Sequence, residues 1–414
     1  MAEREFDVVV WGASGFTGRL VAEHLLTVYG VDGSVKWAIA GRNEHKLKGV
    51  RADMGRKAKA LPVLLADSFD ADSLATLAQR TRVIATTVGP YTRYGNELIA
   101  ACARHGTHYC DLAGEVPWIR RMIDAHNGVA KRSGAVIVNC CGFDSIPSDI
   151  GVWFMQREAQ ARFGKSLQKV HFCLRAASGG MSGGTAASMF EVAEQARKDR
   201  RCAKLLMNPY SLNPRNKADG VDRRDAIGFR RDELLGVWVA PFLMASINTR
   251  IVRRSNALLG HAYGEDFSYN EYTATGTGAS GMAKAAAMSG AMAALMTGAA
   301  FAPTRAALRR FVFPAPGEGP TPEQREAGFF KIELAGIDDE GRILRGRVDG
   351  KRDPGYGCTS RMLGESAVCL ANLTPRRDDE PGGFLTPAAA MGDALLDRLR
   401  RNAEMTFEVT DVIE

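Results

Sequence analysis

The segment Gly12–Gly18 reads Gly-Ala-Ser-Gly-Phe-Thr-Gly and constrains the fold of this chain more than any other. It follows an apolar run, Phe6–Trp11, and precedes an amphipathic stretch, so its three glycines stand where a first strand turns into a first helix. There the first glycine permits a tight turn, the second lets the backbone approach a pyrophosphate, and the third lets helix and strand pack closely. The phosphates bind to amides at the helix N-terminus. The segment therefore predicts a dinucleotide-binding fold.

The residues after the second apolar run indicate which dinucleotide binds. Val35–Ala40 reads as a strand, and Arg42 stands where an NAD enzyme would carry a carboxylate for the ribose hydroxyls. A guanidinium there pairs with a 2′-phosphate and stacks along the adenine, and Lys46 adds a second positive charge one turn on. Two alternatives stay open: Glu44 would favour NAD if it turned inward, and the basic residues would be merely solvated. We predict NADP(H) as the cofactor, bound by Gly12, Ser14, Gly15, Phe16, Thr17, Gly18, Arg42, Asn43, Lys46, Asp67, Val88, Gly89, Pro90 and Tyr91.

The length of 414 residues exceeds what one hydrophobic core supports, so two domains are expected. Short apolar runs alternate with helical segments up to about residue 150, as in βαβ units. From Leu167 onward the apolar segments are longer and alternating, for example Lys169–Ala176 and Phe329–Gly336. The predicted fold class is α/β, with an N-terminal Rossmann-type doubly wound parallel sheet and a second α+β domain with a mixed or antiparallel sheet.

Three parts are expected along the chain. Residues 1–150 form the NADP-binding Rossmann domain, and residues 151–372 form an α+β domain for substrate binding or oligomerisation. Residues 373–414 form a C-terminal segment whose helix, Pro387–Arg401, returns to the Rossmann domain. Thr359–Leu370 reads as a helix at the end of the second domain.

Two segments of the second domain have unusual composition. Residues 208–231 are rich in Asn, Arg and Asp, which predicts an exposed loop or a poorly ordered insertion. Residues 285–302 are nearly uncharged but consist of Ala, Gly, Met and Ser with hardly any Leu, Ile or Val, so the tendency to insert into a membrane is weak. We expect a buried helix or the lining of an apolar substrate channel there. An interfacial helix and a membrane span are the alternatives.

Charge and cysteine content bear on partners and location. The chain carries 54 basic and 47 acidic residues, a net charge of +7, which suits a phosphate-bearing cofactor or an acidic carrier protein, and no nucleic-acid recognition module is visible. Arg305, Arg309 and Arg310 suit lipid phosphates or an acyl carrier protein, although a solvated helix end explains them equally well. The eight cysteines show no metal-ligand spacing, so no metal site is expected. The first strand begins almost at once, without a signal peptide, which favours the cytoplasm and leaves peripheral membrane contact open.

Polar loops follow the later strands of the predicted parallel sheet, at the edge where ligands bind. Tyr91, Asp111 and Asp144 stand in these loops and are candidates for donating a proton or orienting the substrate, because burial raises the pKa of a carboxyl. Glu115 stands there as well, and for Glu115 and Asp144 helix capping is the alternative. The glycine-rich stretch Gly179–Thr185 reads as a mobile loop over the substrate.

Several common enzyme classes are excluded by what the sequence lacks. No tyrosine is followed by lysine four residues later, so the short-chain dehydrogenase mechanism is not expected. No H-E-x-x-H, Walker sequence or nucleophile elbow with a usable triad is present, which removes the common hydrolase classes.

Taken together, these loops resemble the saccharopine dehydrogenase-like oxidoreductases, in the branch of the trans-acting enoyl reductases. The resemblance runs nearly end to end and rests on Gly12–Gly18, Ala40–Asn43, Gly89–Tyr91, His108–Glu115, Cys141–Asp149, Ser182–Thr185, Asp353–Tyr356 and Thr386–Ala388. It implies a nucleotide domain, a mixed α/β domain and a C-terminal helix that packs back on the first. It also implies that NADPH reduces a C=C bond in an acyl or polyketide chain presented by an acyl carrier protein or a polyketide synthase.

Two other functions stay open. The oligomeric state stays open as well, with a homodimer as one possibility. A saccharopine dehydrogenase-like C=N reductase would act on an amino-acid adduct, and its several carboxylates should need two or three inward-facing arginines in the second domain. A non-catalytic NADPH-binding sensor or lipid-surface protein would keep the fold without turnover.

Overall fold

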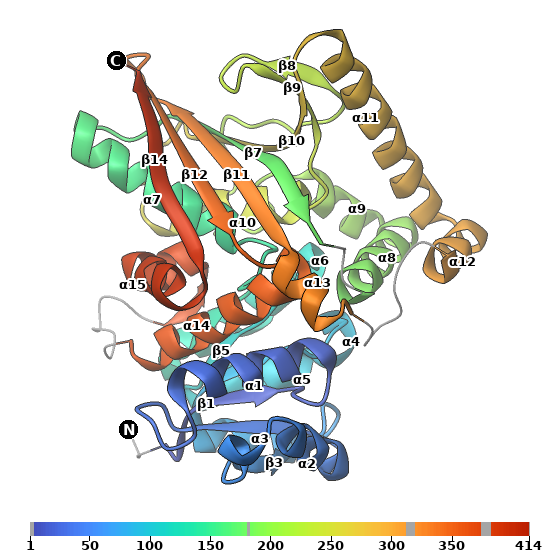
Figure 1. Cartoon of the computed structure of the whole chain (residues 1–414), viewed down its shortest axis with the longest axis vertical. Helices are drawn as coiled ribbons and strands as arrows, with labels where there is room; N and C mark the ends of the chain where they lie inside the picture. The colour runs from blue at the N-terminus through green and yellow to red at the C-terminus, as the bar shows by residue number, and fades with distance from the viewer. Residues whose placement is uncertain (1–3, 180–182, 312–318, 374–381, 414) are drawn as a thin grey trace. The chain divides into compact units, whose positions relative to one another are not determined.

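The computed structural model describes residues 4–179, 183–311, 319–373 and 382–413. The chain divides into two compact units. The first unit contains Met1–Phe143, Pro316–Gly319 and Tyr356–Ala403, and the second contains Asp144–Ala315, Pro320–Gly355 and Glu404–Glu414. Each unit is built on a seven-stranded sheet (Figure 1). One sheet is parallel and the other mixed, which confirms the predicted fold class.

The first unit is a doubly wound α/β structure. Its strands lie in the order β13-β6-β5-β4-β1-β2-β3, and all neighbouring pairs are parallel. The strand order reverses between β1 and β4, which is the switch point where such sheets bind ligands. Its N-terminal elements are β1 (Phe6–Trp11), α1 (Phe16–Tyr29), β2 (Trp37–Gly41), α2 (Glu44–Asp53), β3 (Val63–Leu65), α3 (Ala71–Arg80), β4 (Thr81–Thr86), α4 (Tyr91–Tyr94), α5 (Asn96–His105), β5 (His108–Cys110), α6 (Val116–Ser133) and β6 (Val136–Val138).

Three later elements complete this unit: α14 (Thr359–Ala371), β13 (Gly383–Leu385) and α15 (Pro387–Asn402). β13 pairs in parallel with β6 and extends the sheet. α14 packs on α1 and on β1, β4 and β5, and nearly all its side chains are buried. The expectation that Thr359–Leu370 belongs to the second domain is therefore wrong, because this helix is buried against elements of the first unit.

A buried polar cluster ties these late elements to α1. Glu365 on α14 accepts hydrogen bonds from His24 at 2.8 Å and from Tyr29 at 2.7 Å. Arg398 and Asn402 on α15 bind the same carboxylate at 3.2 and 3.0 Å. These donors keep the pKa of Glu365 below its usual value although burial acts to raise it.

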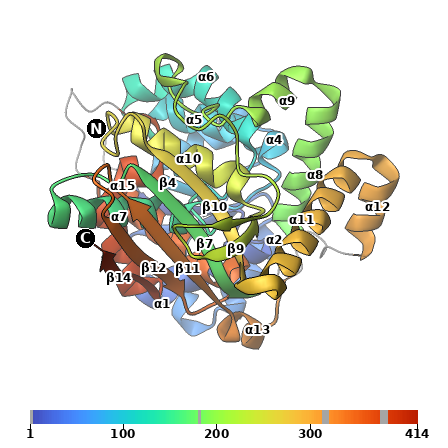
Figure 2. The same ribbon diagram turned by 90° about the horizontal axis from the view of Figure 1, so that it is seen from above.

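The second unit is an α+β structure whose sheet has the order β14-β12-β11-β7-β10-β9-β8. β7 and β10 are parallel and the other neighbours antiparallel, and Figure 2 shows the central strands side by side. The elements are α7 (Ile146–Phe163), β7 (Lys169–Ser178), α8 (Gly183–Lys198), α9 (Arg200–Met207), β8 (Arg230–Asp232), β9 (Val237–Pro241), α10 (Ala245–Leu258), β10 (Ser268–Gly276), α11 (Gly278–Ala300), α12 (Ala302–Phe311), α13 (Pro322–Ala327), β11 (Phe329–Ile337), β12 (Ile343–Gly350) and β14 (Met405–Ile413).

One face of this sheet packs on α7. A Cβ on Gly151 of α7 would lie 3.0 Å from Leu334 and 3.2 Å from Val348, so the helix needs glycine there to approach the strands. β14 pairs with β12 at the sheet edge. The C-terminal segment expected over residues 373–414 is therefore divided between the two units: its helix α15 belongs to the first, and Met405–Ile413 is a strand of the second sheet.

The polar segment 208–231 is anchored rather than fully exposed, contrary to expectation. Its first part, including Leu212 and Asn213, is buried. Asp222 and Asp225 form ion pairs with two buried arginines of α10: Arg253 lies 2.8 Å from Asp222, and Arg250 lies 2.8 Å from Asp225. The charges that suggested an exposed loop are therefore the charges that hold it against α10.

The uncharged segment 285–302 lies mostly in α11, and α11 is largely exposed. Met282, Met288 and Met296 are 43%, 41% and 41% exposed, while its packed side contacts β9 and α8. The expected buried helix or channel lining is therefore wrong, because α11 packs against β9, β10, α8 and α12 on one side but leaves much of its surface exposed. In the described parts of the chain, none of the helices has the length and apolar character needed to cross a membrane.

The basic cluster that follows α11 is only partly described. Arg305 is buried and forms an ion pair with Glu194 at 3.2 Å, so it is not a surface contact for lipid. The side chains of Arg309 and Arg310 lie outside the described residues, as do residues 180–182 of the predicted glycine loop.

Candidate active site

The three fingerprint glycines follow the roles that their spacing predicts. Gly12 has a φ of +88°, and a Cβ there would lie 2.5 Å from a methyl group of Val88. A Cβ on Gly18 would lie 2.3 Å from the carbonyl oxygen of Gly12, so α1 packs closely on the strand-turn. Gly15 is exposed, and a Cβ there would meet only one atom, at 3.3 Å. The backbone at Gly15 is thus open to a phosphate.

The start of α1 offers amides without a competing side chain. No described side chain caps the helix, whose N-cap is Gly15, and its first turn contains no acidic residue. Ser14 is exposed, and its hydroxyl lies 3.8 Å from the place that a Cβ would take on Gly41 at the end of β2. Thr17 is half-buried in the first turn. The ring of Phe16 packs edge-on against Tyr356, with centroids 4.8 Å apart, so its side chain belongs to the core beside the cradle.

The residues that follow β2 are exposed. Arg42 forms no hydrogen bond or ion pair with any residue that the structure describes, and Lys46 uses only its backbone amide. Asn43 is the N-cap of α2 and accepts that amide at 2.9 Å. Glu44 forms an ion pair with Lys48 at 2.7 Å, an observation against the NAD alternative.

Asp67 lies at the end of β3 and closes a local turn, accepting a hydrogen bond from the Phe69 amide at 2.9 Å. Val88, Gly89 and Pro90 form the loop after β4, with a cis peptide bond between Gly89 and Pro90. This loop lies against Gly12, so the ends of β1 and β4 meet as a doubly wound sheet requires.

Tyr91 is buried, and its hydroxyl is fully engaged. It donates to the carbonyl of Thr86 at 3.1 Å and accepts from the amide of Leu112 at 3.1 Å. Glu115 is also buried and accepts from the amides of Tyr91 and Thr92, each at 2.8 Å. Glu115 thus caps the first amides of α4, and helix capping is the alternative that the sequence offers for this residue. Both side chains join the loop after β4 to the loop after β5.

Asp111 is fully buried and accepts four hydrogen bonds. Its Oδ1 accepts from the amides of Ala113 and Cys140, both at 3.0 Å. Its Oδ2 accepts from the Tyr109 hydroxyl at 2.9 Å and from Asn139 Nδ2 at 2.7 Å. Burial raises the pKa of Asp111 to about 6, although the four donors oppose that rise. The carboxylate therefore fastens the end of β5 to the end of β6.

The loop after β6 carries the third candidate. Cys140 has a φ of +64°, which bends the chain sharply at the end of the strand. Asp144 follows in the turn before α7 and is only partly buried, unlike Tyr91 and Asp111. The structure thus brings Tyr91, Asp111 and Glu115 together in the first unit, and Asp144 is the first residue of the second unit.

A further buried carboxyl, that of Glu271, was missed in the sequence. Glu271 on β10 accepts from Tyr269 at 2.8 Å and from Asn248 on α10 at 2.9 Å, and Ser145, just before α7, donates to Asn248 at 3.0 Å. Burial raises the pKa of Glu271 to about 7. No motif surrounds Glu271. The alternation of inward-facing and outward-facing side chains along β10 was the sole signal that this residue points inward.

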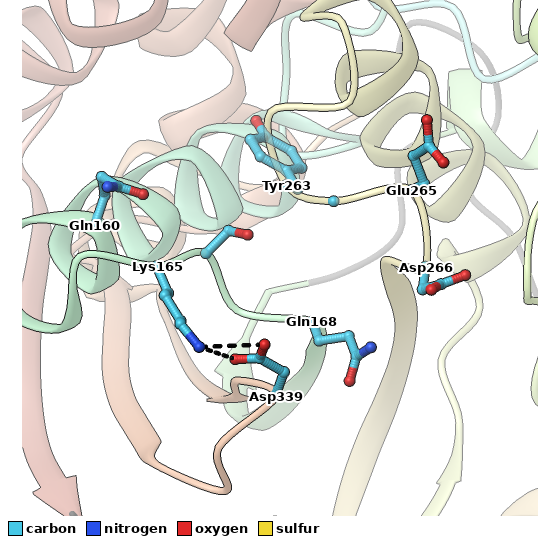
Figure 3. Close-up of a pocket in the computed structure, with 9 residues that line it drawn as sticks. Gln160, Lys165, Gln168, Tyr263, Glu265, Asp266 and Asp339 are labelled. Atoms are coloured by element: carbon cyan, nitrogen blue, oxygen red, sulfur yellow. Dashed lines mark hydrogen bonds and ion pairs between the residues drawn. The ribbon is translucent and has the colours of Figure 1, made fainter.

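One cavity of about 450 Å³ opens in the second unit, away from every predicted site residue. It lies where α7 gives way to β7, beside residues 263–266 and Asp339 (Figure 3). Lys165 points into it but binds Asp339 at 3.1 Å, and the rim carries further carboxylates, Glu265 and Asp266. This polar, self-paired lining does not suit an acyl chain.

Comparison with known proteins identifies the chain. Residues 8–138 match the family model of the saccharopine dehydrogenase NADP binding domain. The trans-acting enoyl reductase of Mycobacterium ulcerans is 40% identical over 409 residues, and that of Mycobacterium bovis is 39% identical over 407 residues, with 96% of each chain covered. A Mycobacterium tuberculosis protein named provisionally in the same way is 42% identical over 405 residues at the same coverage.

The chain belongs to the trans-acting enoyl reductase family. As a member, it is an NADP-dependent oxidoreductase. The saccharopine dehydrogenase (L-Glu forming) of Saccharomyces cerevisiae shares its fold, with a TM-score of 0.52 and 11% identity over 98% of this chain and 99% of that one. The open backbone at Gly15 and the uncapped start of α1 fit the pyrophosphate of NADP(H), whose nicotinamide supplies the hydride when bound.

Proposed function

We propose that this chain reduces a C=C bond conjugated to a thioester carbonyl in an acyl or polyketide chain, which a separate synthase or acyl carrier protein presents. Full-length identity of 39–42% to proteins of this name carries the proposal. In the balanced reaction NADPH gives a hydride to the β-carbon, a protein acid gives a proton to the α-carbon, and the products are the saturated thioester and NADP⁺.

We propose different roles for the three candidate residues. Asp144 is partly exposed and is the proposed proton donor. Tyr91 and Asp111 are buried and bonded to loop amides, so they act as positioning residues that hold the loops around the nicotinamide. Arg42 and Lys46 bind the 2′-phosphate and select NADPH, because their charges are exposed and face no described acidic partner.

The C=N reductase alternative needs inward-facing arginines that are free to bind substrate carboxylates. The second unit does contain buried arginines on α10, but Arg250 and Arg253 are paired with Asp225 and Asp222. This pairing favours the acyl substrate. The net charge of +7 supports an acidic carrier protein as the partner, and the exposed methionines of α11 support peripheral contact with an apolar surface.

NADPH oxidation across a series of substrates tests the proposal. Enoyl thioesters of graded chain length, free and carrier-bound, are compared with saccharopine-type imines. We expect turnover with the enoyl thioesters, greater on the carrier, and a loss of at least about 100-fold in kcat for Asp144→Asn with NADPH affinity retained. Preference for the charged imine would reject the proposal in favour of C=N reduction, and NADPH binding without turnover of either class would favour the sensor.

A further inference from the structure

A turn from late in the chain, Tyr356–Thr359, lies beside the fingerprint in the first unit. It leads into α14, which runs parallel to α1: Tyr356 contacts Phe16 at the start of both helices, and further along a Cβ on Gly364 would lie 2.9 Å from the ring of His24. α14 also packs on β1 and β4, the strands that carry the cradle loops (Figure 1). The start of α14 therefore lies at the same sheet edge as the start of α1.

Tyr356 fixes the first residue of α1. The rings of Tyr356 and Phe16 meet at 70° with centroids 4.8 Å apart, a favourable edge-to-face arrangement. On another side of Phe16, a Cβ at Gly319 would lie 2.4 Å from the ring, so the chain at Gly319 lies directly against it. Two segments distant in sequence thus hold the ring whose own backbone begins the phosphate-binding turn.

Thr359 fixes the loop after β6. Its Oγ1 accepts a hydrogen bond from the amide of Phe143 at 3.0 Å, and the threonine is buried. Phe143 directly precedes Asp144, the proposed proton donor. The amide is partly shielded from solvent and its acceptor is buried, so losing this bond is unfavourable and we take the bond to fix the path of the loop.

The turn itself is irregular in a way that suits a site. Pro354–Cys358 forms a π-helical turn, a rare conformation that occurs frequently at functional sites. The turn carries Tyr356, which lies against Phe16 at the start of α1, and it ends directly before Thr359, which binds the loop after β6.

We infer that the turn Tyr356–Thr359 is a brace within the dinucleotide site, in which Tyr356 positions the phosphate-binding start of α1 and Thr359 positions the loop that faces the nicotinamide. Both are positioning residues that act through Phe16 and Phe143. The inference rests on NADP(H) binding and not on the identity of the acyl substrate.

Nicotinamide fluorescence of bound NADPH tests the brace without any substrate, and stopped-flow hydride transfer tests it with one. For Thr359→Val we expect an NADPH Kd within about threefold of the native value, but a fall of about fivefold or more in both the enhanced emission and the rate of hydride transfer. Thr359→Ser keeps the acceptor oxygen and should restore both. For Tyr356→Leu we expect the Kd to rise about tenfold for NADPH and NADH alike, because the pyrophosphate is common to both.

The matched control for Thr359→Val is Thr410→Val on β14, because Thr410 is exposed and lies in the second unit. Tyr356→Phe, which keeps the aromatic ring, is the control for Tyr356→Leu. If Thr359→Val and Tyr356→Leu both match their controls in Kd and emission, the brace is wrong. If Thr359→Val does not fold by circular dichroism, the Tyr356 pair decides alone. If emission responds as expected but no enoyl thioester is reduced, the brace stands and the proposed substrate falls.

Discussion

The polar side chains differ between two parts of the proposed dinucleotide site, the segment after β2 and the loops after β4 and β5. After β2, where the adenosine phosphate is proposed to bind, Arg42 and Lys46 are exposed, and neither side chain has a described protein partner. In the loops after β4 and β5, Tyr91, Asp111 and Glu115 are buried and bonded to loop amides. A charge left unsatisfied by the protein is available to a ligand, whereas a charge satisfied internally holds the scaffold. Substitutions of Arg42 and Lys46 should therefore change the affinity for NADPH. Substitutions of Tyr91, Asp111 and Glu115 should change the stability of the fold.

The largest expected effect is on Asp111. Asp111→Asn places an amide group among four donors, so we expect a loss of about 4 kcal/mol in the free energy of unfolding, measured in urea. Asp397→Asn on the exposed face of α15 is the control and should change stability by less than about 0.5 kcal/mol. Equal stabilities for the two variants would show that Asp111 is not a fastener and would break the comparison.

The second effect concerns pH and the carboxyl of Glu271. Its pKa is raised by burial to about 7, so the folded state holds a proton more tightly than the unfolded state. Stability is then greatest below the unfolded pKa and falls as pH rises toward 7, by about 3 kcal/mol from this group. Asp111, with a pKa of about 6, adds to the same slope. Thermal or urea unfolding between pH 5 and pH 8 measures it, and Glu271→Gln should flatten the curve; an unchanged slope in that variant would contradict the assignment.

The third effect concerns Arg42. Arg42→Ala removes the charge-assisted contact proposed for the 2′-phosphate, so we expect the NADPH Kd to rise about 30-fold, equivalent to about 2 kcal/mol, with NADH binding and unfolding unchanged. Fluorescence titration with both dinucleotides measures this. Arg82→Ala, on β4 away from the cradle, is the control. A parallel loss for NADPH and NADH would mean that Arg42 does not read the 2′-phosphate.

The smallest expected effect is that of Tyr91→Phe. It removes one hydroxyl between Thr86 and Leu112 and should cost about 1.5 kcal/mol in unfolding free energy, while turnover falls less than about tenfold. Tyr94→Phe, on the same short helix, should leave both unchanged. A loss of turnover far beyond the loss of stability would make Tyr91 the proton donor instead of a positioning residue.

The nucleotide-binding half was predictable because its signals are local. Gly18 is required by the nearby carbonyl of Gly12, Gly15 leaves its backbone open, and Arg42 follows its strand directly. Gly12 is the exception, because the atoms that crowd it belong to Val88, far along the chain. Tyr91 and Asp111 lie in the loops after β4 and β5, where the sequence places them. The bonds that join these loops to other segments, such as Leu112 to Tyr91 and Asn139 to Asp111, leave no trace in the spacing.

The errors arose where distant segments determine the environment. The composition of residues 285–302 indicates burial, but α11 has too few packed neighbours to be covered. The charges of residues 208–231 indicate solvent, but Arg250 and Arg253 neutralise two of them inside the unit. α14 was assigned to the wrong unit, and the strand β14 was not foreseen, because the chain crosses between the units twice near its end. Periodicity carries no information about such crossings.

The addition of β13 beside β6 has a consequence for how the protein is made. Synthesis from the N-terminus delivers six strands of the first sheet early, but the seventh, with α14 and α15, emerges only after the whole central portion has been translated. Until then the nascent molecule carries an open strand edge and an uncovered apolar face, conditions that invite misassociation. A chaperone acting on the ribosome-bound polypeptide should therefore bind the early half for most of its elongation.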